Sequence, residues 1–221
     1  MTDILYQWPA SARFGARVPK ERFYERTAST AALREKFVAE VDRISWAYKL
    51  AAETINLPGS PEVPEIEVLQ LDAKSSDISA QVLAAIDKAI PNPLIFEINR
   101  EDTDGRAVRM TAAHKPVGSP APRPSAYFST GWVRGDMLRT PLPTAITMAA
   151  LYSALIGPLT PLAPRPGESP AVVGERLDVV RRLEREIRAL ERKLRSEPQL
   201  NRKVELRREL TAKQAELDQT R

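Results

Sequence analysis

The sequence contains no cysteine and one histidine, and both shortages limit its chemistry. Without cysteine the chain forms no disulfide, has no thiol nucleophile and supplies no sulfur ligand for zinc or an iron–sulfur cluster. A single histidine, His114, excludes a histidine-cluster metal site and leaves one candidate for a histidine-dependent triad. No Gly-x-Ser-x-Gly string accompanies it, so we interpret His114 as a surface residue at the end of a strand.

Glycine is also scarce, with nine residues in 221, and neither a Walker-type Gly-Lys-Ser/Thr nor a Gly-x-Gly-x-x-Gly string occurs. Loops that cradle phosphate therefore have little material, which argues against autonomous nucleotide hydrolysis. No apolar run approaches the roughly 18 residues of a membrane span, and the first residues lack the basic region of a leader. We expect a cytoplasmic protein with no membrane partner and no cofactor.

Charge is nearly balanced along the chain. The 33 basic and 29 acidic side chains give a formal net charge of +4. Residues 168–221 contribute 14 basic and 11 acidic side chains, which leaves 19 against 18 in residues 1–167. This balance argues against a strongly basic nucleic-acid domain in the first three quarters of the chain.

Apolar periodicity predicts alternating helices and strands over residues 1–157. A helix is expected over residues 30–53, capped by Ser29 or Thr30, because apolar residues recur at spacings of three and four. Its apolar positions are Leu33, Phe37, Val41, Ile44 and Tyr48. Further strands are predicted at 65–71, 94–98, 107–112 and 125–133, and further helices at 77–90 and 145–156. The order predicts an α+β fold with helices packed on a mostly antiparallel sheet.

A proline-rich stretch, residues 158–167, is predicted to separate this domain from a C-terminal antiparallel helical hairpin or coiled coil at 168–221. Leucine-lined patterns on either side of Pro198 indicate the two helices. The apolar seam is narrow, and we expect it to need a protein partner. The expected partner-binding residues are Leu183, Ile187, Leu190, Leu194, Val204, Leu210 and Leu217.

The most enzyme-like string is Asp72-Ala73-Lys74, which follows the predicted strand at 65–71. Many metal-dependent nucleases place an acidic residue and a lysine two apart on a core strand, where the carboxylate holds Mg²⁺ and the lysine steadies the attacking water. Glu65, Glu67 or Glu97 is a candidate for the second carboxylate. An alternative hypothesis is therefore a Mg²⁺-dependent nuclease that uses Asp72, Lys74 and Glu67. Asp-x-Lys also occurs by chance in most proteins.

A third hypothesis is a nucleic-acid-binding module. The aromatic residues Phe14, Phe23 and Tyr24 lie among cations near the N-terminus, an arrangement suited to base stacking and phosphate contact. The alternative is that these rings anchor the segment on the core and that hairpin arginines pair with neighbouring glutamates. The candidate contacts are Lys20, Arg22, Arg26, Arg181 and Arg185.

Five segments follow one another in an order that resembles a known family. They are Val18–Tyr24, Phe37–Trp46, Glu53–Leu57, Glu65–Val68 and Ile86–Pro91. Over roughly residues 1–155 the chain resembles a bacterial family known as domain of unknown function 4391, and residues 201–206 are similar to the helical ends of such proteins. The resemblance implies association with helicases and DNA methyltransferases in restriction or phage-defence gene clusters. It implies no catalytic residues.

The hypothesis that follows is a non-catalytic accessory subunit of a prokaryotic DNA-targeting complex for restriction or anti-phage defence. We expect it to dock through its α+β domain and its hairpin on a helicase or methyltransferase subunit of the same system, on a second copy of itself, or on both. Nucleic acid is a further candidate partner within the complex.

Overall fold

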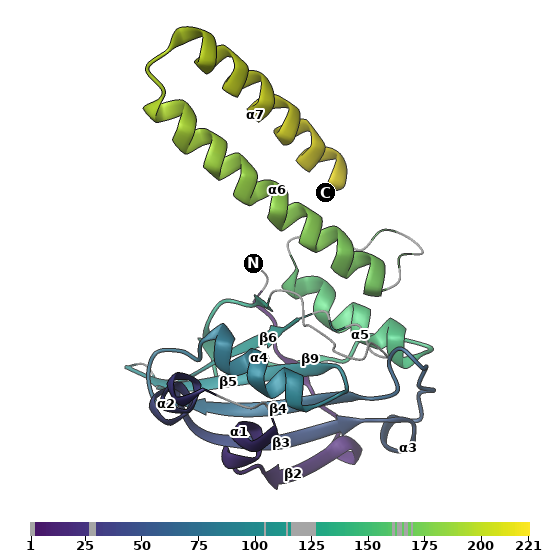
Figure 1. The fold of residues 1–221 in the computed structure, drawn as a ribbon. Coiled ribbons are helices and arrows are strands. Elements are labelled where there is room, and N and C mark those ends of the chain that lie inside the picture. Colours follow the sequence, from purple (N-terminus) through teal and green to yellow (C-terminus); the bar gives the residue numbers. More distant parts are fainter. Residues whose placement is uncertain are drawn as a thin grey trace. The chain divides into compact units, whose positions relative to one another are not determined.

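A mixed β-sheet forms the centre of the first part of the chain in the computed structural model (Figure 1). The structure describes residues 3–26, 30–103, 105–113, 115, 127–160, 162, 165, 168 and 170–221, with only the backbone described at 24–26, 170 and 171. His114 lies outside the described residues. The chain divides into two compact units, Met1–Pro170 and Ala171–Arg221.

The elements of the first unit follow in chain order. They are β1 (Tyr6–Gln7), η1 (Ala10–Ala12), β2 (Arg13–Arg17), α1 (Glu21–Arg26), α2 (Ala31–Glu40), β3 (Val41–Leu50), α3 (Ala52–Ile55), β4 (Ile66–Ala73), α4 (Ala80–Ala89), β5 (Leu94–Asp102), β6 (Gly105–Ala112), β7 (Phe128–Ser129), β8 (Val133–Arg134), β9 (Thr140–Pro141), α5 (Met148–Ile156) and η2 (Gly157–Leu159). The helices α6 (Pro170–Ser196) and α7 (Leu200–Thr220) follow.

The main sheet has the strand order β2-β3-β4-β5-β6-β7, with β8 also paired to β6. All its neighbouring strands are antiparallel except β4 and β5, which are parallel. Parallel neighbours need a crossover connection, and α4 supplies it between β4 and β5. The short strands β1 and β9 pair with each other in a separate parallel ribbon. The prediction of helices on a mostly antiparallel sheet is confirmed.

Helices α1, α2 and α4 cover one face of the sheet (Figure 1). Side chains alternate along a strand, so Leu69 and Leu71 of β4 both face these helices. Phe37 of α2 is fully buried, and Phe23 of α1 stacks on it with ring centroids 6.3 Å apart. The rest of this core comes mainly from Ile44, Val82, Leu83, Ile86, Phe96 and Ile98.

The helix predicted over residues 30–53 is wrong beyond Glu40, because residues 41–50 form strand β3. Two irregularities interrupt the pairing of β3 with β4, one between Val41 and Arg43 and one between Trp46 and Tyr48. A bulge inserts an extra residue and shifts the alternation of the side chains. Buried residues consequently recur every third position, at 41, 44, 47 and 50, which imitates helical spacing.

Several other predicted boundaries also shift. The strand predicted at 125–133 consists, within the described residues, of the short strands β7 and β8. The helix predicted from residue 145 begins at Met148, where the Thr147 hydroxyl accepts a hydrogen bond from the Ala150 N–H at 3.2 Å. The spacer predicted at 158–167 begins with part of a short 3₁₀ helix, and several of its residues lie outside the described part of the chain.

The second unit is the predicted hairpin, and this prediction is confirmed. Helices α6 and α7 pack against each other and are joined by residues 197–199 (Figure 1). Ion pairs connect them, with Arg221 Nη2 at 3.0 Å from Glu184 Oε1 and Lys213 Nζ at 3.2 Å from Glu186 Oε2. Pro198 lies in the connection, where a residue without a backbone N–H does not interrupt a helix.

Candidate functional site

Asp72 lies near the carboxyl ends of the parallel strands β4 and β5, opposite Asn99 of β5. In sheets with parallel strands, ligands commonly bind outside the carboxyl ends of those strands. A cavity of about 490 Å³ opens at these ends, and we call it the polar hollow. It is lined by Asp42, Arg43, Asp72, Ala73, Lys74, Asn99, Arg100, Glu101 and Arg106. The structure thus brings Asp72 and Lys74, both singled out in the sequence, into one cavity.

Both oxygens of the Asp72 carboxylate are engaged by neighbouring side chains. Arg43 holds Oδ2 with two nitrogens, Nε at 2.7 Å and Nη2 at 2.6 Å. Asn99 Nδ2 donates to Oδ1 at 3.0 Å, and Arg106 Nη2 lies 3.5 Å from the same oxygen. Charge-assisted bonds from an arginine fork are among the strongest that a carboxylate accepts. The negative charge of Asp72 is therefore paired with the side chains of Arg43 and Arg106.

The side chain of Lys74 is bonded to a backbone carbonyl of α2 and not to Asp72. Its Nζ donates to the backbone carbonyl of Val38, near the end of α2, at 2.8 Å. Its backbone N–H also bonds the Glu40 carbonyl at 2.9 Å, which fixes the chain just after β4. A lysine that activates water beside a metal needs its ammonium group near the metal-bound carboxylate. Both residues line the same cavity, but they bond to different groups. Asp72 is bonded to Arg43 and Asn99, and Lys74 is bonded to the backbone of α2.

Glu67 is the carboxylate proposed from the sequence to assist Asp72, and the structure separates the two. They lie five residues apart on β4, or roughly 16 Å, and an odd spacing on a strand places them on opposite faces. Trp46 Nε1 donates to Glu67 Oε2 at 2.6 Å, and Asn92 Nδ2 donates to Oε1 at 3.2 Å. Glu67 therefore orients the Trp46 indole rather than assisting Asp72.

The other two candidates for a second carboxylate are also paired elsewhere. Glu65 forms an ion pair with Lys49 at 2.7 Å. Glu97 is fully buried and accepts hydrogen bonds from Trp8 Nε1 at 2.7 Å and from Arg139 Nη1 at 2.6 Å. Over the described ranges of the chain, no three acidic or histidine side chains lie where they would hold a metal ion.

Asp42 is the acidic residue that sequence reasoning missed. It lines the polar hollow together with Asp72, because the start of β3 lies beside the end of β4. Because the sequence analysis predicts a helix over residues 30–53, it does not place Asp42 or Arg43 beside Asp72. The density of β-branched and aromatic residues from Val41 to Tyr48 was the available signal for a strand.

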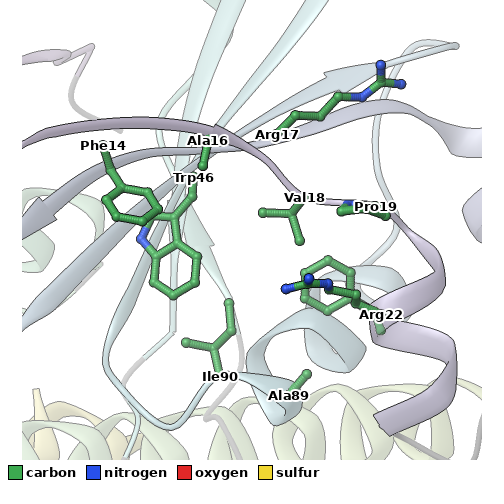
Figure 2. A pocket seen from close by; sticks show the side chains of 10 residues that line it. Phe14, Ala16, Arg17, Val18, Pro19, Arg22, Trp46, Ala89 and Ile90 are labelled. Carbon is green, nitrogen blue, oxygen red and sulfur yellow. The ribbon is translucent and has the colours of Figure 1, made fainter.

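A second cavity, of about 480 Å³, lies beside Trp46, and we call it the aromatic hollow (Figure 2). The rings of Phe14 and Trp46 lie side by side there, 5.5 Å apart and tilted by 51°. Phe14 is 57% exposed, unusual for so large an apolar side chain. The full lining is Phe14, Ala16, Arg17, Val18, Pro19, Arg22, Phe23, Trp46, Ala89 and Ile90.

The five predicted nucleic-acid contacts are divided between the two units. Arg22 lines the aromatic hollow, and Lys20 Nζ donates to the Val41 carbonyl at 2.5 Å. Burial, and then the neighbouring charge of Lys74, lowers the pKa of Lys20. The side chain of Arg26 lies outside the described part of the chain. Arg181 and Arg185 belong to α6, and burial lowers the pKa of Arg181.

The predicted partner-binding residues of the hairpin differ in exposure. Leu183, Ile187, Leu190 and Leu217 are buried, and Leu194 and Leu210 are half-buried. Val204 is 42% exposed, and Leu200, which is not among the predicted residues, is 75% exposed. Leu200 and Val204 are four residues apart on α7 and therefore share one helix face. We call them the exposed α7 pair.

The fold and its cavities define an α+β protein with a charged hollow at the carboxyl ends of two parallel strands and an appended helical hairpin. The chain belongs to the family described as domain of unknown function (DUF4391), whose model matches residues 7–217. No curated protein and no solved structure matches it. Over the residues described, no helix has both the length and the apolar character needed to cross a membrane.

Glu67 makes stability depend on pH. Burial, reinforced by neighbouring Glu65, raises the pKa of Glu67 to about 7, against the opposing hydrogen bonds of Trp46 and Asn92. Between the ordinary pKa of a glutamate and about 7, the folded state keeps a proton on Glu67 that the unfolded state loses. The stabilising contribution of this group is therefore fully present at acidic pH and is lost as pH rises through 7. Between about pH 5 and 8 the free energy of unfolding should fall by roughly 2 kcal/mol from this group.

Urea denaturation of wild type and of Glu67→Gln at several pH values measures this contribution. The amide should flatten the pH dependence, whereas Glu62→Gln, at an exposed position, should retain the slope of the wild type. Burial raises the pKa of Asp87 in the same direction, so a residual slope is expected in Glu67→Gln. Equal slopes in all three proteins would show that Glu67 is ionised in the folded state throughout this range.

Proposed function

We propose that this protein is a non-catalytic accessory subunit of a prokaryotic DNA-targeting complex for restriction or anti-phage defence, and that it works in the cytoplasm. It docks on a larger protein through its α+β unit and its C-terminal hairpin. The observation that carries this proposal is the state of Asp72, whose two oxygens are already bonded by Arg43, Asn99 and Arg106.

The ion pairs of Asp72 argue for binding rather than catalysis. A catalytic carboxylate must present an oxygen to a metal ion or to a reacting proton. Here the arginine fork of Arg43 occupies one oxygen and an amide the other. Lys74 is bonded to a backbone carbonyl instead of facing this carboxylate. The residues that most resemble an active site thus form a charged binding surface.

The exposed α7 pair supports docking through the hairpin. Leu200 is 75% and Val204 42% exposed, at the start of a helix whose other exposed side chains are mostly charged or polar. Anchors one helical turn apart are typical of a helix that a partner covers. The resemblance to a family whose members accompany helicases and DNA methyltransferases supports one of these enzymes as the partner, and a second copy of the chain is the other candidate.

Substitution of both anchors should weaken docking by about tenfold or more. Tagged full-length protein is expressed in its native host, and the helicase or methyltransferase encoded beside it is quantified by mass spectrometry after purification. Leu200→Glu/Val204→Glu should recover at least roughly tenfold less of that enzyme, because burial of two apolar side chains is replaced by burial of charge. Thr211→Glu/Ala215→Glu adds the same charge at exposed positions of α7 and should leave recovery unchanged.

Light scattering on the same proteins distinguishes the two partners. A wild-type dimer that becomes monomeric only in the Leu200→Glu/Val204→Glu variant would assign the exposed pair to self-association. If the wild type is strictly monomeric and recovers none of the enzymes encoded beside it, the accessory role is wrong.

The second candidate function is a Mg²⁺-dependent nuclease that uses Asp72 and Lys74. One observation favours it: Asp42, Asp72 and Lys74 line the same hollow at the carboxyl ends of the parallel strands. Two carboxylates at such an edge are a common way to hold Mg²⁺. The bonding of Asp72 to Arg43 weighs against it, since Arg43 would have to move before a metal ion could bind.

Incubation of plasmid DNA with purified protein and Mg²⁺ or Mn²⁺ tests this candidate. We expect wild type and Asp72→Asn to give the same background nicking, because the oxygens of Asp72 are paired with Arg43 and Arg106 and do not hold a metal ion. Cleavage that is lost in both Asp42→Asn and Asp72→Asn, yet kept in Lys88→Met at an exposed position of α4, would make the protein an enzyme.

A further inference from the structure

Three cavities lie next to one another on the α+β unit. Between the aromatic hollow and the polar hollow is a third cavity of about 330 Å³, which we call the middle hollow. It shares Arg17, Val18 and Pro19 with the aromatic hollow, and Asp42 and Arg43 with the polar hollow. A ligand longer than a single small molecule can therefore contact all three.

Positive charge is concentrated along this path. Seven basic and four acidic side chains line the three hollows. Residues 1–167 as a whole carry 19 basic and 18 acidic side chains, so the path holds an excess of cations that the rest of the unit balances. Such local excess attracts an anionic ligand even on a protein of low net charge.

Four arginines on this path have hydrogen-bond donors to offer. Among the described residues, Arg17 and Arg22 form no ion pair and both are exposed. Arg43 and Arg106 share the single carboxylate of Asp72, and their side chains remain 54% and 49% exposed. Each guanidinium has five N–H donors, so one carboxylate leaves several directed outward. These donors suit phosphate oxygens.

The aromatic end of the path suits a planar ring. Trp46 Nε1 is bonded to Glu67, so the indole is held in place and its face borders the cavity beside Phe14 (Figure 2). Val18 and Ile90 add an apolar floor, and no acidic side chain lines this hollow. Its volume of about 480 Å³ has room for a base and its sugar. Every nucleobase has a π face that stacks on such rings.

We propose that the three hollows bind one strand of single-stranded nucleic acid. A base stacks on Phe14 and Trp46, and the adjoining phosphates contact Arg17, Arg22, Arg43 and Arg106. This inference rests on the proposed function and names the ligand that the α+β unit contacts within the complex. A duplex keeps its base faces covered by stacking, and the acidic side chains of a peptide carry no planar ring for the aromatic hollow, whereas every nucleotide joins a ring to a phosphate. The observations therefore favour an unpaired strand.

Fluorescence anisotropy of a labelled oligothymidine with the full-length protein tests this proposal. Saturable binding is expected at about 50 mM salt and should weaken steeply toward about 200 mM, because phosphate contacts release counterions. Oligouridine is the parallel probe and distinguishes DNA from RNA as the source of the strand. An oligothymidine annealed to its complement should bind more weakly than the free strand.

Two pairs of variants separate stacking from charge. Phe14→Ala should raise Kd by a factor of roughly 10, as expected for loss of one stacked base. Leu138→Ala, at a position 90% exposed and outside the three hollows, should leave Kd unchanged. Arg17→Gln/Arg22→Gln should lower the slope of log Kd against log salt by about 1.4, since each lost phosphate contact contributes about 0.7. Arg34→Gln/Arg134→Gln removes two exposed charges elsewhere and should keep the slope.

The proposal is overturned if neither strand binds at low salt, or if Phe14→Ala and Arg17→Gln/Arg22→Gln bind as wild type does. Tighter binding of the duplex would assign the path to double-stranded DNA and also overturns it. So would displacement of the strand by polyglutamate at equal charge, which would indicate an acidic polypeptide. None of these results depends on the exposed α7 pair, so failure here and failure of partner docking are distinguishable.

Discussion

The parallel pairing of β4 with β5 is the constraint on which the other features of the α+β unit depend. Its register runs from Glu67 opposite Leu94 to Asp72 opposite Asn99. Parallel neighbours require a crossover, which places α4 over one face and lets its apolar residues fill the core with Phe37 and Phe96. The same pairing directs the carboxyl ends of both strands to one side of the sheet, where the side chains of Asp72 and Asn99 bond at 3.0 Å. The polar hollow opens at that edge.

Asp72 forms ion pairs with arginines from two further strands at this edge. Arg43 comes from the start of β3 and Arg106 from β6, and each lies within bonding distance of the same carboxylate. The carboxylate thus holds two exposed guanidinium groups in place. Its single negative charge is smaller than their combined positive charge, so this cluster of three side chains remains positive. Near Trp46, Glu67 plays the corresponding part for an aromatic ring by bonding its indole N–H. In both places a buried or half-buried acid positions a group that faces solvent, which is the arrangement expected of a binding surface.

Much of this fold follows from the sequence, and the exceptions have physical causes. The hairpin was predictable because leucines recur at helical spacing on both sides of Pro198. The strands β4, β5 and β6 were predictable because each contains a short alternating or continuous apolar pattern. Strand β3 was not, because its two irregular pairings space the buried residues three apart. Because residues 41–50 were predicted as helix, nothing in the sequence indicated that Asp42 and Arg43 lie beside Asp72.

The candidate site was predictable only as a string of residues. Asp72 and Lys74 do line one cavity, but no local pattern reveals that Arg43, Asn99 and Arg106, from three other strands, converge on Asp72. The assignment of Glu67 as the second carboxylate depended on strand position alone, and its five-residue separation from Asp72 places it on the other face. Long-range pairing, which the sequence does not display, decided the chemistry of both residues.

The most direct measurement is a titration of the isotopically labelled, full-length protein with Mn²⁺, followed by NMR. If arginines neutralise Asp72, the amide signals of Asp42, Asp72 and Asn99 should broaden no more than those of exposed acidic residues elsewhere in the chain. Selective broadening of these three signals at low Mn²⁺ concentration would show that the polar hollow holds a divalent cation, and would contradict the account of it as a binding surface for anions.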